Sequence, residues 1–456
     1  MLIEFSVANY RSFRDKVTLS MVASSLKAKN AELNEKNIFP AHGKLKLLTS
    51  AAIYGANASG KSNLISALNF MRNFVIFSAN VQEEEDRAGI EVEPFRLSTE
   101  TDSEPSFFEV VFVVKERRYR YGFEVTAERV EEEWLYVAPK ARESKLFERE
   151  EDVIEPGDKF RAEGGDLVER TRPTALFLSL CAQFNGKIAG EVLGWFRSIG
   201  ITTGLMDLEE GMRSFTERML RDEDSAKTIG DLLTKLDLGI EAVHLERVEA
   251  PAPRLLPLPD DATEELRKLH NEARKMEEAM KSFQEAFSEL SDLNSGEREV
   301  VRTIHRKAGE GDQSDLEELF DLDWHESEGT KKLFSLSGPL VDTLRRGDVL
   351  IIDELDARLH PLLTKEIVSL FNDPVRNSKH AQLVFATQDT NLLDNQLLRR
   401  DQIWFVEKDR HGASYLYSLA EFKVRNDATY EKDYIHGRYG AIPYLGGLRH
   451  VLLEQD

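Results

Sequence analysis

Segment 55–62 reads Gly-Ala-Asn-Ala-Ser-Gly-Lys-Ser, a pattern of residue types that suits phosphate binding. Its glycines let the backbone curl so that N–H groups point inward at phosphate oxygens. Lys61 can reach the β- and γ-phosphates of a nucleotide, and the Ser62 hydroxyl can hold Mg²⁺. The alternative is an accidental glycine-rich turn. The residue types, their spacing and the flanking segments all agree with phosphate binding. The expected ATP-binding residues are Gly55, Ala56, Asn57, Ala58, Ser59, Gly60, Lys61, Ser62 and Asn63.

A second group of residues that could take part in catalysis is the pair Asp353-Glu354, which follows the aliphatic run 349–352. Asp353 at the end of a strand would hold Mg²⁺, directly or through water. Glu354 beside it is placed to orient or deprotonate an attacking water. An aliphatic run ending in an acid is common by chance, so this assignment depends on the phosphate loop upstream. Together the two segments predict a Mg²⁺-dependent ATPase.

These side chains need a strand and a helix on each side of the phosphate loop. The apolar run 51–54 precedes the loop, and an apolar pattern at helical spacing follows it from Leu64 to Met71. Asp353 comes roughly 290 residues after Lys61. The ATPase sheet must therefore be split, with insertions between its two halves.

Composition describes a large, acidic protein. The chain has 456 residues, of which 82 are acidic and 60 basic, giving a net charge of −22. A protein with this excess of negative charge does not attract nucleic acids non-specifically, so any contact with DNA or RNA needs a local basic patch. Cys181 is the one cysteine, the N-terminus lacks the pattern of a signal peptide, and no apolar run is long enough for a membrane span. We therefore expect a cytoplasmic protein that makes no membrane contact.

The first third of the chain favours antiparallel strands. Residues 2–22 alternate like a hairpin with its turn at 9–15, and 107–114 with 119–125 predict a second hairpin. The turn of the second hairpin gathers Lys115, Arg117, Arg118 and Arg120. This group is either a phosphate or nucleic-acid contact or a solvated hairpin tip.

The middle of the chain is expected to be helical. Residues 165–240 have a mostly helical pattern, and a proline-rich linker occupies 251–259. Apolar residues spaced three and four apart then predict a heptad helix over 262–293, either a coiled-coil arm or dimer contact, or one long helix packed on the protein's own core. We expect three parts: an N-terminal ATPase lobe with antiparallel β subdomain (1–165), a helical insertion (166–300) and a C-terminal ATPase lobe (301–456).

Four further features have structural interpretations. Asp321-x-Asp323 has the spacing of a metal pair but lacks the strand that should precede it, so we expect a loop. His360 before Pro361 is expected to be structural or to contact another subunit. The strand pair 403–406 and 414–417 should close the fold, and the tail 436–443 either docks a partner or folds onto the head.

The chain resembles the ABC-type ATPase heads of the SMC/RecF/OLD group, and more closely bacterial AAA-type ATPases of the RloA and abortive-infection AbiL type. The phosphate loop continues as Ser62-Asn63-Leu64, as in this group. Segment 9–13, Asn-Tyr-Arg-Ser-Phe, resembles its N-terminal motif. Segment 353–361 resembles its Walker B and D-loop, 387–389 its switch, and 326–330 its signature motif. The resemblance implies an α/β, ABC-type P-loop NTPase head with a split mixed sheet, an antiparallel β subdomain and a helical insertion.

The resemblance also implies catalysis by a head-to-tail pair of subunits. Ser327 and Gly329 of one subunit would cap the γ-phosphate held by Lys61 of the other, and Asp356 would couple the two sites. The alternative for Ser327 is a plain helix cap. The remaining expected site residues are Arg11 at the nucleotide, Gln388 in place of the usual switch histidine, and Gln183 as a weak candidate for the Q-loop.

The function implied is an ATPase subunit, a homodimer or larger homo-oligomer formed through the ATP sandwich. It would be the sensor or motor of a bacterial anti-phage defence system that controls a separately encoded effector, such as a nuclease. The alternative is a RecF/SMC-like DNA-binding ATPase of DNA repair or chromosome maintenance. Nucleic-acid contact is possible under either hypothesis.

Overall fold

The computed structural model describes residues 1–28, 30–80, 89–101, 103–140, 142–202, 206–236, 239–249, 297–307, 316–424 and 429–443, with a few positions between 263 and 275. These residues form two compact units, Met1–Arg213 with Gly338–Asp456, and Ser214–Ser337. The expected threefold division of the chain stays a prediction. The linker 251–259 and nearly all of the heptad segment 262–293 lie outside the described residues. Within the described part, no helix combines the length and apolarity needed to cross a bilayer.

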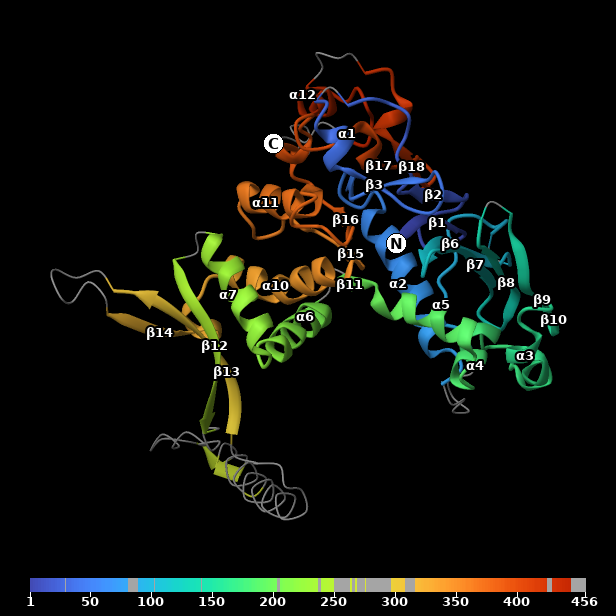
Figure 1. Ribbon diagram of the computed structural model, residues 1–456, viewed down its shortest axis with the longest axis horizontal. Helices are drawn as coiled ribbons and strands as arrows, with labels where there is room; N and C mark the ends of the chain where they lie inside the picture. Colours follow the sequence, from blue (N-terminus) through green and yellow to red (C-terminus); the bar gives the residue numbers. More distant parts are fainter. Residues whose placement is uncertain are drawn as a thin grey trace. The chain divides into compact units, whose positions relative to one another are not determined.

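A mixed, mainly parallel sheet forms the centre of the first unit (Figure 1). Its order is β11 (Gly200–Thr202), β15 (Val349–Ile352), β16 (Gln382–Ala386), β5 (Ser50–Tyr54), β17 (Ile403–Lys408) and β18 (Ser414–Ser418). All neighbours are parallel except β18, which runs antiparallel to β17. The strands β5, β15 and β16 are buried along their whole length, as expected for a sheet covered on both faces. This sheet joins strands from both ends of the chain, which confirms the predicted split.

A second sheet of the same unit is antiparallel. Its order is β10 (Val153–Pro156), β9 (Ser144–Glu150), β8 (Val130–Ala138), β7 (Arg117–Val125), β6 (Ser106–Val114), β1 (Leu2–Ala8) and β2 (Val17–Ser20). Both predicted hairpins, β1–β2 and β6–β7, are present. The Gln382 side chain joins the two sheets, because it accepts from Leu2 N at 2.6 Å and donates to the Leu2 and Leu48 carbonyls.

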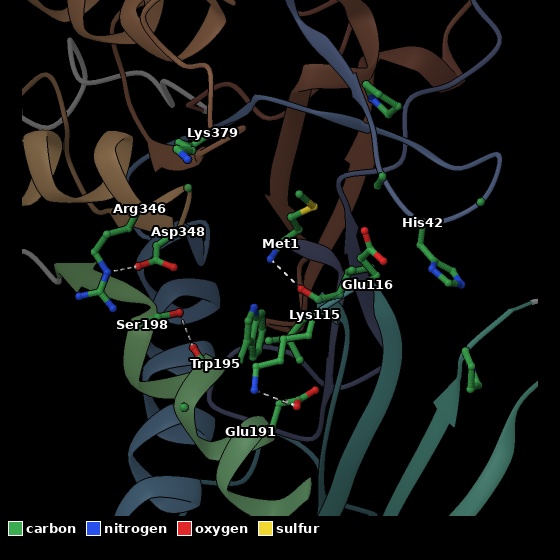
Figure 2. Close-up of a pocket in the computed structure, with 18 of the residues that line it drawn as sticks. Met1, His42, Lys115, Glu116, Glu191, Trp195, Ser198, Arg346, Asp348 and Lys379 are labelled. Carbon is green, nitrogen blue, oxygen red and sulfur yellow. Dashed lines mark hydrogen bonds and ion pairs between the residues drawn. The ribbon is translucent and has the colours of Figure 1, made fainter. Parts of the chain in front are cut away.

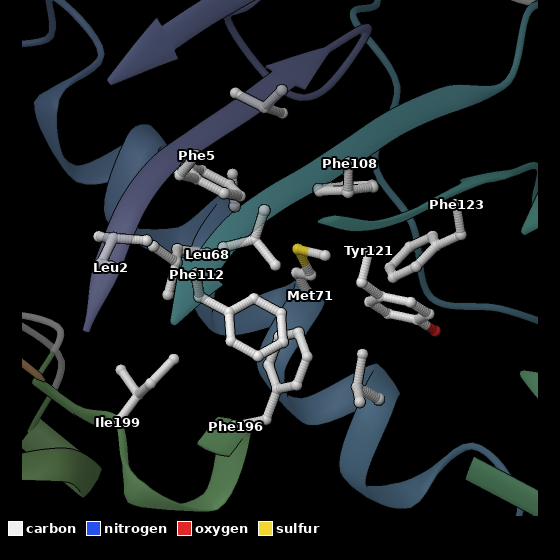
Figure 3. Packing of buried hydrophobic residues seen from close by; sticks show 14 of the residues in the cluster. Leu2, Phe5, Leu68, Met71, Phe108, Phe112, Tyr121, Phe123, Phe196 and Ile199 are labelled. Carbon is white, nitrogen blue, oxygen red and sulfur yellow. The ribbon is translucent and has the colours of Figure 1, made fainter. Parts of the chain in front are cut away.

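Helix α2 (Lys61–Phe77) lies between the two sheets. Its apolar residues, including Leu68 and Met71, belong to one core with Phe108 and Phe112 of β6 (Figure 3). Helices α4 (Phe177–Gln183) and α5 (Lys187–Ser198) pack on α2, and Phe196 of α5 completes this core. The helix that begins at the phosphate loop is therefore fixed by burial along most of its length.

Smaller elements complete the first unit. They are α1 (Leu33–Lys36), the hairpin β3 (Ile38–Pro40) and β4 (Lys46–Leu48), α3 (Arg161–Gly164), η1 (Gly165–Arg170), α11 (Pro361–Asn372), η3 (Thr390–Leu392), η4 (Arg400–Gln402), η5 (Leu419–Glu421) and α12 (Tyr430–Ile435). The Tyr434 ring of α12 packs 5.9 Å from the Tyr54 ring. In the tail that follows, the Tyr439 ring packs 5.7 Å from the Phe405 ring, and the Tyr439 carbonyl accepts from the Tyr417 hydroxyl at 2.8 Å. The described tail 436–443 is therefore folded onto the head, which is one of the two expected outcomes.

The second unit contains the sheet β12 (Ile240–Glu249), β13 (Glu297–Arg306) and β14 (Glu317–Asp321), with α7 (Glu223–Lys235) and α9 (Leu322–His325). Two longer helices, α6 (Met206–Met219) and α10 (Glu328–Arg346), extend into it. Pro339 inside α10 has no N–H for the Ser335 carbonyl. The buried Thr216 hydroxyl donates to the Ser335 carbonyl at 2.9 Å. This hydrogen bond replaces the one that a backbone N–H at position 339 would have made.

Candidate nucleotide-binding site

The segment 55–60 connects the carboxyl end of β5 to the first residue of α2. Gly60 has φ +116°, a conformation that side-chain-bearing residues rarely adopt, and a Cβ there would lie 2.5 Å from Ser414 Oγ and 2.8 Å from Ser12 Oγ. A Cβ at Gly55 would lie 2.5 Å from Ser59 Oγ. The loop is therefore packed too tightly for larger residues at either glycine, and its N–H groups precede a helix N-terminus, which favours anions.

Lys61 is buried and folds back over the loop. Its ammonium donates to the Gly55 carbonyl at 2.8 Å and to the Ala56 carbonyl at 3.2 Å. Burial lowers the pKa of Lys61, and the negative charges of Asp353, Glu354 and Asp356 act in the opposite direction. The carboxylates at the end of β15 are therefore close enough to Lys61 to influence its charge.

Asp353 sits at the carboxyl end of β15 and is 8% exposed. Its backbone N–H donates to the Thr202 carbonyl of β11 at 2.9 Å. Its Oδ1 atom is buried and has no hydrogen-bond partner within the described part of the chain. An orphaned buried carboxylate oxygen normally needs a partner, so the donor set fits a hard cation such as Mg²⁺. Ser62, the other expected ligand, is exposed in the first turn of α2.

The residues after Asp353 form a tight, hydrogen-bonded turn. Glu354 is exposed and has φ +51°, which is unusual for a residue with a side chain. Leu355 N donates to the Ala386 carbonyl at 3.1 Å, which ties the turn to the end of β16. Both carboxylate oxygens of Asp356 accept from Gln388 N at 3.3 Å. The predicted D-loop and switch residues are therefore in direct contact within one chain.

The switch segment is also anchored to the strand that leads into the phosphate loop. Thr387 N donates to the Ile53 carbonyl at 3.1 Å, and the buried Tyr54 hydroxyl donates to the Asp389 carbonyl at 3.2 Å. The Gln388 side chain is left exposed at this edge. The carboxyl ends of β5, β15 and β16 thus bring together three sequence-distant segments.

The N-terminal motif 9–13 lies against the phosphate loop. Asn63 Nδ2 donates to Ser12 Oγ at 2.8 Å, and Ser414 of β18 donates from its N–H to the Ser12 carbonyl and from its hydroxyl to the Ser59 carbonyl. Arg11 has φ +48°, forms an ion pair with Glu93 at 2.8 Å, and keeps a buried Nε without a partner among the described residues. Sequence reasoning missed Ser414, because a single serine in a strand carries no local signal.

The signature segment 326–330 belongs to the second unit. Ser327 Oγ accepts from Thr330 N at 3.2 Å, so Ser327 caps the N-terminus of α10 and Gly329 lies in its first turn. The neighbouring Glu326 accepts from the Thr303 hydroxyl and pairs with His305 Nε2 at 2.7 Å. This geometry agrees with the alternative that Ser327 is a helix cap. The contact of Ser327 with a second subunit stays a prediction.

Gln183, Asp321 and His360, which the sequence singles out, each lie at the end of a helix. Ser179 of α4 contacts Val75 and Ser78 at the far end of α2, roughly 20 Å along the helix from Lys61. Gln183 ends α4, one helical turn after Ser179, and a Q-loop role for it stays a prediction. Asp321 is the last residue of β14 and caps α9, and Asp323 lies within α9, so the expected loop without a preceding strand is wrong. Asp321 pairs with Arg302 at 3.2 Å, which gives its carboxylate a structural partner. His360 similarly caps α11.

The hairpin cations are largely neutralised. Lys115 pairs with Glu191 at 3.2 Å, Arg118 with Glu143 at 3.4 Å, and Arg120 with Glu143 and Glu109 at 3.0 and 3.1 Å. This arrangement favours the solvated-tip interpretation over a nucleic-acid contact. The described residues hold no cluster of three or more metal-binding side chains elsewhere that would suggest a second catalytic centre.

The chain belongs to a family of AAA-type ATPases. The family model described as "AAA domain, putative AbiEii toxin, Type IV TA system" matches residues 50–247 and 235–394, which include both halves of the site. This match, with the strand order and the phosphate loop, confirms the predicted AAA/ABC-type ATPase class. No curated protein sequence matches the chain.

Three solved structures share low similarity with the chain. An SmcHead bound to the C-winged helix domain of ScpA has 13% identity and TM-score 0.41, covering 91% of this chain and 97% of that one. The SMC head domain from Thermotoga maritima has 14% identity and TM-score 0.38, with coverage of 91% and 98%. The recombination mediator protein RecF with ATP has 17% identity and TM-score 0.33, with coverage of 91% and 97%. All three scores are below 0.5, so the fold assignment does not depend on them.

Proposed function

We propose that the protein binds and hydrolyses ATP with Mg²⁺ at the carboxyl ends of β5 and β15. The observation that carries this proposal is that β5 and β15 both pair in parallel with β16, so the phosphate loop and Asp353, which are far apart in sequence, lie at the same edge of the sheet. The unpartnered Asp353 Oδ1 supports the assignment of a cation at the same place.

Each residue has a proposed role. The N–H groups of segment 55–60 and the Lys61 ammonium would hold the phosphates, once Lys61 leaves the carbonyls that it now contacts. Ser62 and Asp353 would hold Mg²⁺, which when bound neutralises charge on the phosphate oxygens. Glu354 would orient the attacking water and accept its proton. Gln388 can donate a hydrogen bond but cannot carry a proton, so we expect slow or partner-dependent turnover.

We also propose that the active form is a homodimer. Ser327 and Gly329 stand at the N-terminus of the long helix α10, where backbone N–H groups and the helix dipole favour an anion. They would complete the site of a second subunit, with Asp356 between the two sites and Arg11 at the nucleotide. The exposed positions of Ser327, Glu354 and Gln388 leave them accessible to such a partner.

The biological role that we propose is the ATPase of a cytoplasmic bacterial anti-phage defence system, acting on a separately encoded effector such as a nuclease. The family description names a putative AbiEii toxin of a Type IV toxin–antitoxin system, which supports this class of role. The RecF/SMC-like DNA-binding alternative requires a basic surface. The net charge of −22 and the paired hairpin cations weigh against it.

Two assays test the proposal. Wild-type protein should release phosphate from ATP in Mg²⁺, and Lys61→Ala should abolish this release, whereas the exposed Lys36→Ala should not. Equal rates in the wild type and Lys61→Ala would refute the site. A gel-shift titration over salt concentration then separates the two biological roles. Strong ATP-dependent DNA binding by the isolated protein would favour the repair function.

A further inference from the structure

Ser414, the first residue of β18, holds the phosphate loop from outside the loop's own segment. It is 1% exposed, and its hydroxyl donates to the Ser59 carbonyl at 2.6 Å. Its backbone N–H donates to the Ser12 carbonyl at 2.7 Å, which ties the start of β18 to the N-terminal motif. The Ser12 hydroxyl in turn accepts from Asn63 Nδ2 at 2.8 Å. Segments that are distant in sequence therefore meet at one peptide group of the loop.

The peptide between Ser59 and Gly60 carries its C=O and its N–H on opposite sides, because it is planar and trans. The Ser414 hydroxyl fixes the carbonyl on the side that faces β18, so the Gly60 N–H must point away from β18. Gly60 is buried, and its N–H donates to no acceptor in the part of the chain that the structure describes. Buried N–H groups normally have a partner. This one is therefore available to a phosphate oxygen.

Close packing keeps this peptide in one orientation. A Cβ at Gly60 would lie 2.5 Å from Ser414 Oγ and 2.8 Å from Ser12 Oγ, so both hydroxyls stand directly against the glycine. The peptide cannot turn over unless one of these hydroxyls moves. The φ of +116° at Gly60 belongs to the same arrangement, since it is open to glycine and strained for other residues.

The two edges of the parallel sheet are held by different kinds of contact. At the amino edge, beside a cavity of about 950 Å³, Arg346 pairs with Asp348, which directly precedes β15, at 2.9 Å (Figure 2). At the carboxyl edge, the neutral hydroxyls of Ser12 and Ser414 hold the phosphate loop. A hydroxyl binds a carbonyl without placing a full charge beside the loop. The backbone N–H groups of the loop therefore remain available to an anion.

We propose that Ser414 is a positioning residue for nucleotide binding. Its hydroxyl turns the Ser59–Gly60 peptide so that the Gly60 N–H donates to the α- or β-phosphate, which ATP and ADP share. Ser414 itself does not touch the nucleotide and acts through the backbone of the loop. This proposal rests on the proposed function, because it requires that the loop binds a nucleotide.

The first test measures the Kd of the full-length protein for ADP and for a non-hydrolysable ATP analogue by isothermal titration calorimetry. Ser414→Ala removes one hydroxyl and should weaken both nucleotides by the same factor, roughly three- to tenfold. The factor is the same because both nucleotides carry the phosphates near Gly60. The matched control is Ser418→Ala in the same strand, where a buried hydroxyl donates to the Ile403 carbonyl at 3.3 Å. This control should leave both affinities unchanged.

The second test follows the Gly60 amide itself by NMR. The sequence has three Ser-Gly pairs, at 59–60, 295–296 and 337–338. Isotopic labelling of serine carbonyl carbons and glycine nitrogens therefore selects three amide signals, and Ser59→Ala identifies the one from Gly60. Saturating ADP should shift the Gly60 amide proton downfield in the wild type and clearly less in Ser414→Ala. A general loss of stability would not reduce this shift at saturation.

Circular dichroism checks that each variant is folded. If Ser414→Ala is not, Ser414→Cys, whose thiol is a weaker donor, decides the question by the same two measurements. The proposal is overturned if the folded variant binds ADP with wild-type affinity, or if its Gly60 amide proton shifts as far as in the wild type. A wild type that binds neither nucleotide would refute the proposed function itself, and this proposal with it.

Discussion

Both carboxylate oxygens of Asp356 accept a hydrogen bond from the backbone N–H of Gln388, each at 3.3 Å. This contact joins the turn after β15 to the turn after β16, on either side of the place where Glu354 would position water. The position of the switch segment thus depends on a charged side chain of the neighbouring turn.

Asp356→Ala should slow ATP turnover about tenfold or more, because Gln388 N loses its hydrogen bonds to the Asp356 carboxylate. Gln388 lies beside the place proposed for the attacking water. The Kd for ATP should stay close to the wild-type value, since the phosphate loop is unchanged. Steady-state phosphate release and isothermal titration calorimetry measure the two quantities. Asp394→Ala, which removes a surface ion pair with Lys365, is the control. A weakened Kd with unchanged turnover would contradict this role.

Glu354→Gln should abolish turnover and trap an ATP-bound dimer. Glutamine keeps the shape of the side chain but cannot accept the proton of water at neutral pH. Size-exclusion chromatography with light scattering should then detect dimers in ATP and Mg²⁺ but not without nucleotide. Glu366→Gln, an exposed change on α11, should behave like the wild type. Normal phosphate release by Glu354→Gln would remove Glu354 from the proposed mechanism.

A row of glutamates crosses the antiparallel sheet, with Glu124 opposite Glu132 and Glu132 opposite Glu150. Burial, together with the charges of Glu132 and Glu131, raises the pKa of Glu124. A raised carboxylate pKa stabilises the folded state when the group is protonated, and this contribution is lost as pH rises through that pKa. Glu132→Gln removes one charge from the row.

The variant should therefore raise the free energy of unfolding at pH 7 by about 0.2–1 kcal/mol. The gain should shrink toward pH 4, where the wild-type row takes up protons. Urea unfolding at both pH values measures the difference, and Glu100→Gln on an exposed loop is the control. A gain that is larger at pH 4 than at pH 7 would contradict the repulsion argument.

Thr216→Val should destabilise the second unit by about 1–3 kcal/mol, because the buried Ser335 carbonyl would lose the Thr216 hydroxyl at a place where Pro339 supplies no N–H. Valine has nearly the shape of threonine, so packing is preserved. The urea midpoint measures the loss. Thr234→Val, at an exposed threonine of α7, removes a similar side-chain hydrogen bond and should cost much less. Equal midpoints for Thr216→Val and the wild type would show that the Ser335 carbonyl needs no such donor.

The sequence by itself determined the elements whose signal is local. The loop 55–62 and the strand ending at Asp353 are recognisable because phosphate and metal binding demand particular residue types at fixed spacing. The hairpins β1–β2 and β6–β7 were predictable for a similar reason, since alternation and turn residues lie within a few positions of each other.

Only the tertiary structure decided which distant residues meet. Ser414 and Thr202 reach the site through strand pairing across the sheet, and no short pattern encodes such a neighbour. The hairpin cations look like a basic patch in sequence, yet Glu143 and Glu191, from later segments, neutralise them. The packing of α4, which ends at Gln183, on the far end of α2 is another such outcome. Ion pairs and helix packing join residues that are distant in the chain, so their outcome is fixed only when the whole chain folds.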